Sequence, residues 1–199
     1  MKFDIDPKAK GLIFDLDGTI VDSMPIHYVA WKETALKYGI DLSVEMFESQ
    51  AGVPIYATVE KYNVIFNKNI DPREMGDAKE KMYEENLHKA TMIEPVFDII
   101  KKYHGKIPMS IGTGGGRYIA QKTVEMMGLD KYFNIMVTAD DVQKFKPHPE
   151  TFLRCAELMG VAPEDCIVFE DGKPGMKAAV DGGMMLVDVT KYYEVTTGK

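Results

Sequence analysis

The sequence predicts an α/β fold in which helices cover both faces of a parallel sheet, with a small all-helical insert near the amino terminus. Two patterns support this prediction. After residue 91, short apolar runs alternate with segments of helical spacing, as expected for a parallel sheet. Between residues 22 and 91, no segment has the pattern of a buried strand. The chain of 199 residues is 45% apolar, enough for one substantial core and a small second one.

The first strand is expected at the apolar run of residues 12–14. Two aspartates, Asp15 and Asp17, follow it directly, and Gly18 allows the backbone to turn. Two carboxylates this close repel each other in apolar surroundings, unless a divalent cation, a shared proton or a catalytic role relieves the repulsion. A plain turn and a calcium loop are the alternatives, but a calcium loop would continue with more oxygen ligands and a distal glutamate.

The helical insert, residues 22–91, is expected to contain helices at about 25–38, 43–50, 55–67 and 72–90. In the first of these, Ile26, Val29 and Leu36 form one stripe, and His27 and Trp31 lie on roughly the opposite side. Such a helix would pack on one side and face something else on the other.

The remaining strands are expected at about residues 107–112, 135–137, 167–169 and 185–187, with helices at about 95–103, 117–127, 149–160 and 173–182. Because the carboxyl ends of parallel strands share one edge, ligands bind there in such sheets. Polar segments follow the strands at this edge. Each could be an ordinary loop, but four of them at strand ends indicate a shared site.

Three of these segments suit an anionic ligand. Thr113 and the bare N–H of Gly114 at a helix start are typical of a phosphate cradle. Pro147 keeps Lys146 extended, where a fixed ammonium could neutralise a phosphoryl group and the aspartates. The acids Glu170-Asp171 leave a buried strand together, which is unfavourable without a nearby cation.

Composition limits the partners. The net charge of −7 argues against nucleic acid or an anionic membrane, and no apolar run has membrane-spanning length or the character of a signal peptide. Cys155 and Cys166 lack metal-ligand spacing, so we expect buried thiols in a reducing compartment. We therefore expect a cytoplasmic protein, a monomer or weak dimer, that binds a small molecule.

In order along the chain, Asp15-Leu16-Asp17-Gly18-Thr19, Thr113, Lys146-Pro147 and Glu170-Asp171 resemble the four motifs of the haloacid dehalogenase-like hydrolases. The resemblance covers residues 11–189 and implies a Rossmann-like three-layer α/β/α core domain formed by residues 1–21 and 92–199. The helical insert resembles the small C1-type cap domain of this family. The likeness is to the beta-phosphoglucomutase-like branch, particularly its phosphatases of fructose-1-phosphate and 6-phosphogluconate.

The resemblance implies a phosphatase that uses Mg²⁺ and acts on a small phosphorylated metabolite. Asp15 would be the nucleophile that forms an aspartyl-phosphate, and Asp17 would act as general acid and then general base. The metal would be held by Asp15, the main-chain carbonyl of Asp17, Glu170 and Asp171. The phosphoryl oxygens would be held by Thr113, Gly114 and Lys146.

Within the insert, His27, Trp31, Gly52 and Lys81 fall where this branch has substrate-facing residues. Ordinary packing, or a solvated lysine, is the alternative for each of them.

Two positions depart from the pattern of the branch. Ile55 stands where the mutase has an arginine that grips a second phosphate, which favours hydrolysis over a beta-phosphoglucomutase-like mutase reaction. Gly172 replaces a usual serine after the acidic pair. A non-catalytic module that binds a phosphorylated ligand is a further alternative, but it would require a lost catalytic group, and none is missing from the four motifs.

Overall fold

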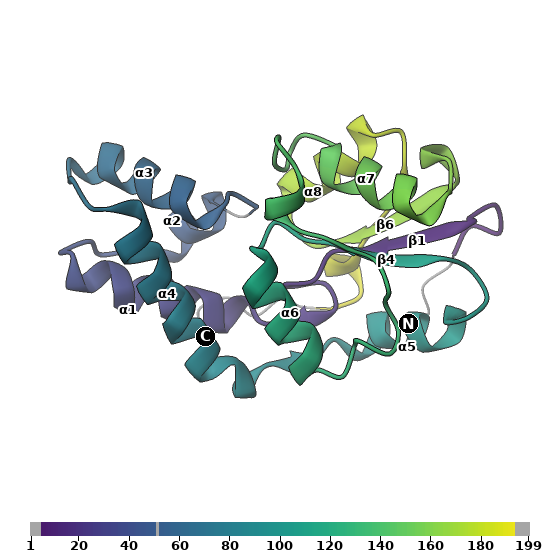
Figure 1. The fold of residues 1–199 in the computed structure, drawn as a ribbon, viewed down its shortest axis with the longest axis horizontal. Helices are drawn as coiled ribbons and strands as arrows, with labels where there is room; N and C mark the ends of the chain where they lie inside the picture. Colours follow the sequence, from purple (N-terminus) through teal and green to yellow (C-terminus); the bar gives the residue numbers. More distant parts are fainter. Residues whose placement is uncertain (1–4, 51, 194–199) are drawn as a thin grey trace.

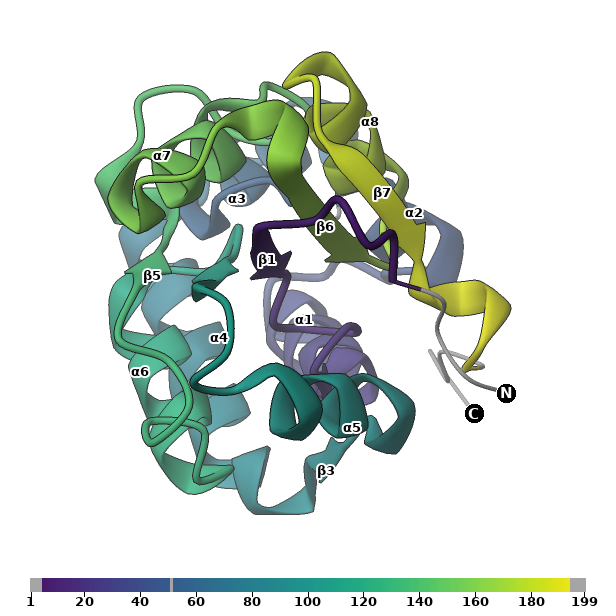
Figure 2. The same cartoon turned by 90° about the vertical axis from the view of Figure 1, so that its right-hand side faces the viewer.

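The computed structural model describes residues 5–50 and 52–193, and its centre is a five-stranded parallel sheet. The strands follow the order β5-β4-β1-β6-β7, so the first strand of the chain lies in the middle (Figure 2). Their bounds are β1 (Gly11–Phe14), β4 (Met109–Gly112), β5 (Met136–Val137), β6 (Cys166–Glu170) and β7 (Met185–Asp188). All four later strands therefore occur where the sequence predicts them.

Helices cover both faces of this sheet (Figures 1 and 2). One face is covered by α5 (Glu94–Tyr103) and α6 (Arg117–Met126), and the other by α7 (Glu150–Met159) and α8 (Lys173–Asp181). Along β1, Leu12 and Phe14 contribute to the first core and Ile13 to the second, as the two-residue period of a strand requires. The predicted three-layer α/β/α architecture is confirmed.

The helical insert lies beside the sheet and has a core of its own (Figure 1). It contains α1 (Met24–Lys37), α2 (Val44–Ser49), α3 (Ile55–Phe66), α4 (Pro72–Asn86) and the 3₁₀ turn η1 (Leu87–Lys89). Its core includes Tyr28, Trp31, Leu42, Phe47, Val59, Tyr62 and Met75. Elsewhere in the described residues lie the 3₁₀ turns η2 (Ala139–Asp141), η3 (Pro163–Asp165) and η4 (Val189–Lys191).

A two-stranded antiparallel ribbon joins the insert to the sheet. It is formed by β2 (Val21–Asp22) and β3 (Thr91–Met92), with Val21 opposite Met92. These strands lie at the two ends of the insert. The elements between them are helical, as the sequence predicts.

The structure shows which side of α1 packs in the core of the insert. Val29 and Leu36 are 49% and 59% exposed, whereas Trp31 is buried in the core of the insert. Apolar residues occur all around this helix, so its own periodicity does not select a buried face. Helix α4 packs against α1, and this packing determines which face of α1 is buried.

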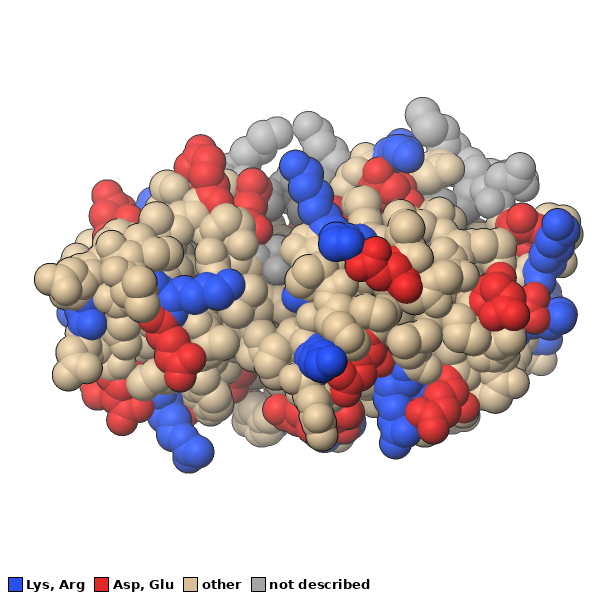
Figure 3. All heavy atoms as spheres, turned by 90° about the horizontal axis from the view of Figure 1, so that it is seen from above, with Lys and Arg blue, Asp and Glu red and all other residues tan. Residues whose placement is uncertain are grey.

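The charges on one face and the two thiols can be compared with the composition. On the face seen in Figure 3, acidic and basic side chains are interspersed, so this face has no extended field of one sign. Cys155 and Cys166 are free and buried. None of the helices in the described part of the chain is long and apolar enough to cross a membrane.

Candidate active site

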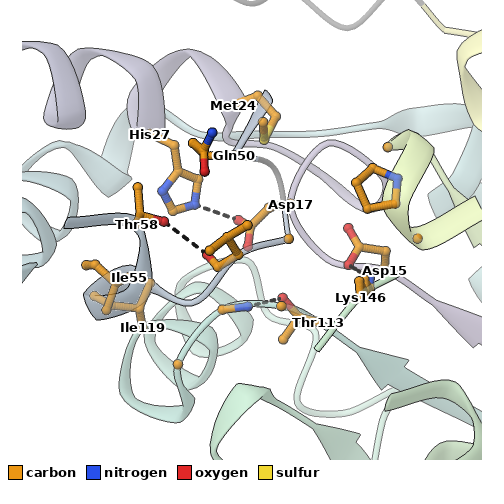
Figure 4. A pocket seen from close by; sticks show the side chains of 18 of the residues that line it. Asp15, Asp17, Met24, His27, Gln50, Ile55, Thr58, Thr113, Ile119 and Lys146 are labelled. Carbon is orange, nitrogen blue, oxygen red and sulfur yellow. Dashed lines mark hydrogen bonds and ion pairs between the residues drawn. The ribbon is translucent and has the colours of Figure 1, made fainter. Parts of the chain in front are cut away.

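A pocket lies between the helical insert and the carboxyl ends of the central strands (Figure 4). The sheet side contributes residues that follow β1, β4, β5 and β6, and the insert contributes residues of α1, α2, α3, α4 and the loop after α2. The pocket therefore forms at the strand edge where the sequence predicts a ligand site. Ten of the eleven predicted site residues line it: Asp15, Asp17, His27, Trp31, Gly52, Thr113, Gly114, Lys146, Glu170 and Asp171.

The floor of the pocket is a buried cluster of opposite charges. Lys146 Nζ donates to Asp15 Oδ1 at 2.7 Å and to Glu170 Oε1 at 2.8 Å. These three residues are 3–6% exposed, so little water screens their interaction. The ammonium also lies 4.5 Å from the centre of the Phe152 ring. Two partners and an aromatic face hold Lys146 in one orientation beside the predicted nucleophile.

The charges of this cluster depend on one another. Burial raises the pKa of Asp15 to about 7, with the Glu170 carboxylate adding to the rise and Lys146 opposing it. Burial alone would lower the pKa of Lys146, but Asp15 and Glu170 outweigh it and raise the value above the ordinary range. The lysine therefore stays charged, and its ammonium favours the ionised form of Asp15 against the effect of burial.

Asp171 brings a third carboxylate to the cluster. Oxygens of Asp15, Glu170 and Asp171 lie within 4.8 Å of one another. Burial, with Glu170 adjacent, raises the pKa of Asp171 well above its ordinary value. One lysine does not balance three such carboxylates, and clustered carboxylate oxygens are the ligands that Mg²⁺ prefers. These residues therefore fit a divalent cation.

Glycines make room for the carboxylates of this cluster. A Cβ at Gly175 would lie 1.6 Å from Glu170 Oε1, and one at Gly18 would lie 2.3 Å from Asp171 Oδ2. Gly18 also has φ +86°, a conformation that glycine adopts without strain. At the position where a serine is usual, the backbone N–H of Gly172 donates to Glu170 Oε2 at 2.6 Å. The carboxylate thus has a backbone donor despite the glycine.

The Asp17 carboxylate lies outside this cluster and faces the insert. Ser23 Oγ donates to its Oδ1 at 2.6 Å, and His27 Nε2 lies 3.2 Å from the same oxygen (Figure 4). On the other side of the imidazole, Nδ1 is 2.9 Å from Lys79 Nζ. Tyr83 stacks on the imidazole at 3.9 Å between ring centres. A hydrogen-bonded chain therefore connects Asp17 to a buried lysine of α4.

The protonation of this chain follows from its environment. Burial and the nearby ammonium lower the pKa of His27, and burial lowers the pKa of Lys79 to about 8. Burial alone would raise the pKa of Asp17, but His27, Ser23 and Lys79 outweigh it and lower the value to about 2. The neutral imidazole accepts from Lys79 at Nδ1 and donates to Asp17 from Nε2.

The loop after β4 forms the wall opposite the acids. Thr113 is buried, and its Oγ1 accepts from the N–H of Gly115 at 3.0 Å. Gly114 and Gly115 present backbone without side chains to the pocket. A Cβ at Gly114 would lie 3.1 Å from Gly52 Cα, so the Gly52 turn of the insert lies directly against this loop. The predicted phosphate cradle and the predicted turn are in contact.

The structure does not place Lys81 in the pocket. Lys81 is exposed on α4, and Lys79, two residues earlier, lines the pocket in its place. Lys79 belongs to a ladder of buried residues four apart, Met75, Lys79, Tyr83 and Leu87. This spacing is the sequence signal that could have identified Lys79. Trp31 both lines the pocket and packs edge-on against Tyr62. A position facing the substrate and a packing role are therefore compatible for this residue.

Comparisons with known proteins agree with this geometry. The model of the haloacid dehalogenase-like hydrolase family matches residues 12–189, and the chain belongs to this family of enzymes. It is 38% identical over 179 residues to fructose-1-phosphate phosphatase YqaB of Escherichia coli, covering 90% of this chain and 95% of the relative. It is 27% identical over 179 residues to a phosphorylated carbohydrates phosphatase of Thermotoga maritima, covering 88% and 82%.

Among solved structures, a beta-phosphoglucomutase from Clostridium difficile superposes with a TM-score of 0.82 at 25% identity, covering 90% of this chain and 84% of that one. The predicted family, branch and fold are therefore confirmed.

Proposed function

We propose that this hydrolase is a Mg²⁺-dependent phosphatase of small phosphorylated metabolites, with a sugar phosphate of the fructose-1-phosphate or 6-phosphogluconate type as substrate. The main support is that one pocket contains both the buried Asp15–Lys146–Glu170 cluster and the ionised Asp17 at its edge. This combination provides a nucleophile, a phosphoryl-binding cation and an acid–base group. The names of the phosphatase relatives support the same reaction.

In the first step, an Asp15 carboxylate oxygen attacks phosphorus, and the bond from phosphorus to the sugar oxygen breaks. Lys146, the Thr113 hydroxyl and the Gly114 N–H stabilise the charge that develops on the phosphoryl oxygens. Asp15, Glu170 and Asp171 would hold Mg²⁺, which supplies positive charge for the phosphoryl oxygens when bound. The product on the protein is an aspartyl-phosphate at Asp15.

Asp17 exchanges the protons of both steps. It gives a proton to the departing sugar oxygen and then takes one from the water that hydrolyses the aspartyl-phosphate. Because Asp17 is ionised at rest, it must first receive a proton. His27 connects it to Lys79, whose pKa of about 8 suits proton exchange near neutral pH. His27 belongs to α1 and Lys79 to α4, so both residues of this proton path come from the insert.

A mutase reaction is the second candidate, because of the similarity to a beta-phosphoglucomutase structure. That reaction requires the enzyme to retain a bisphosphate and therefore a second phosphate grip. Within the described part of the chain, Lys79 and Lys146 are the lysines that line the pocket, and both contact other residues. Ile55 lines the pocket where the mutase has arginine. These observations favour hydrolysis.

The test is phosphate release from a panel of sugar phosphates, with Mg²⁺ or with a chelator and without any bisphosphate activator. We expect turnover that requires Mg²⁺. Asp15→Asn should abolish turnover while retaining ligand binding, because the amide is a poor nucleophile of nearly the same shape. The control is Asp98→Asn, which changes an exposed carboxylate of α5 that pairs with Lys101. Full activity in Asp15→Asn would refute the assigned nucleophile.

A further inference from the structure

One carboxylate in the pocket has no function in the proposed reaction. Glu80 follows Lys79 on α4, lines the pocket and is half-buried. Its side chain makes no hydrogen bond or ion pair with the residues that the structure describes. A Cβ at Gly116 would lie 3.7 Å from Glu80 Oε1, so the carboxylate reaches from the insert almost to the loop after β4. Glu80 thus lines the pocket from the insert, close to Gly116, with its acceptors unused.

The surroundings of Glu80 add negative charge. A Cβ at Gly116 would also lie 3.9 Å from Asp140 Oδ2. Burial raises the pKa of Glu80, Lys79 opposes the rise, and Asp77 and Asp140 add to it. Next to Glu80, the glycines of the loop after β4 provide no side chain that could carry a positive charge. Lys79, the neighbouring cation, already contacts His27.

We propose that Glu80 determines the charge of the part of the substrate that is not transferred. Its two carboxylate oxygens accept hydrogen bonds from sugar hydroxyls, and its charge repels a second acidic group. This inference rests on the proposed phosphatase function and narrows it. The preferred substrates are monophosphates with a neutral polyhydroxyl remainder, whereas sugar acids such as 6-phosphogluconate and sugar bisphosphates are disfavoured.

A matched pair of substrates tests this inference. Glucitol 6-phosphate and 6-phosphogluconate are open chains that differ at the end far from the phosphate, where the first has a CH₂OH group and the second a carboxylate. We expect the wild-type enzyme to have a higher kcat/KM for glucitol 6-phosphate. In Glu80→Gln, the ratio of the two kcat/KM values should shift by about tenfold toward 6-phosphogluconate, because a like-charge repulsion is removed.

The control is Glu85→Gln, which removes the same charge from an exposed position of α4 outside the pocket. Its substrate ratio should stay within about twofold of wild type, since water screens an exposed charge. An equal shift in both variants would show that net charge, not the position of Glu80, sets the preference, and would overturn the inference.

The outcomes for Glu80 and for the phosphatase function are separable. If wild type hydrolyses glucitol 6-phosphate and the ratio in Glu80→Gln is unchanged, Glu80 has no such role, but the phosphatase function stands. If wild type hydrolyses neither ester, calorimetric dissociation constants for both compounds, in Asp15→Asn with and without Glu80→Gln, decide the question. A ratio of dissociation constants that does not depend on Glu80 would equally refute the proposal.

Discussion

Replacing Lys79 by methionine should stabilise the protein while impairing catalysis. Lys79 is 5% exposed, and its ammonium contacts a neutral imidazole, while no carboxylate of residues 5–50 or 52–193 is bonded to it. A buried cation without such a partner destabilises a fold. Methionine has a similar length and packs well against the Trp31 and Tyr83 rings that now surround the ammonium.

The magnitude follows from the pKa. Burial lowers the pKa of Lys79 from its ordinary 10.5 to about 8, so the unfolded chain binds this proton more tightly than the folded protein does. This difference between the two pKa values lowers the free energy of unfolding by about 3 kcal/mol at any pH below 8. Loss of the hydrogen bond to His27 offsets about 1 kcal/mol of the gain. We therefore expect Lys79→Met to raise the free energy of unfolding by about 2 kcal/mol at pH 7.

The assay is urea unfolding followed by circular dichroism and by the fluorescence of Trp31, the single tryptophan of the chain. The advantage of Lys79→Met should be constant below pH 8 and should disappear between pH 8 and 10.5, because folded wild type then loses its unfavourable charge. Lys81→Met is the matched control, since Lys81 is exposed on the same helix, and its effect should stay within about 0.5 kcal/mol.

A Lys79→Met variant that is less stable than wild type at pH 7 would refute this reasoning. So would a stabilisation that stays the same from pH 7 to pH 10.5, because it would then come from packing and not from the buried charge.

Three further predictions concern the other parts of the site. Lys146→Met leaves Asp15 and Glu170 buried without their cation, so urea unfolding in chelator should show a loss of about 3–5 kcal/mol; an unchanged midpoint would contradict the charge cluster. Gly18→Ala would force Asp171 to move, and the Mg²⁺ concentration for half-maximal activity should rise at least about tenfold; an unaltered Mg²⁺ titration would argue against Asp171 as a ligand. In wild type, kcat/KM should fall as pH rises above about 8, because Lys79 then loses the proton that it shares with His27; a pH–rate profile that is flat to pH 9.5 would exclude that role.

The sheet and its catalytic edge could be predicted because their signals are local. The apolar run before Asp15 and the one before Glu170 are long enough to indicate buried strands. Parallel pairing then brings their ends together whatever the intervening length. Asp15 and the acids at the end of β6 lie close together for this reason.

The side chains of the insert were less predictable, because their orientation depends on packing between helices. On the polar helix α4, Lys79, Glu80 and Lys81 are adjacent, and propensity does not distinguish the buried one from the exposed ones. The contacts of α4 with α1 and α3 make that choice. The same contacts turn Val29 of α1 outward and Trp31 inward.

The ribbon of β2 and β3 gives the insert a modular character. The chain leaves the sheet region at Val21 and returns at Met92, and these two residues are paired side by side. The pairing of β2 with β3 therefore holds the two ends of the insert together. The segment between these strands has an apolar core of its own. Exchange of that segment for another of different length would keep Asp15, Lys146 and Glu170 together, but it would remove His27 and Lys79 from Asp17 and alter which molecules reach the pocket.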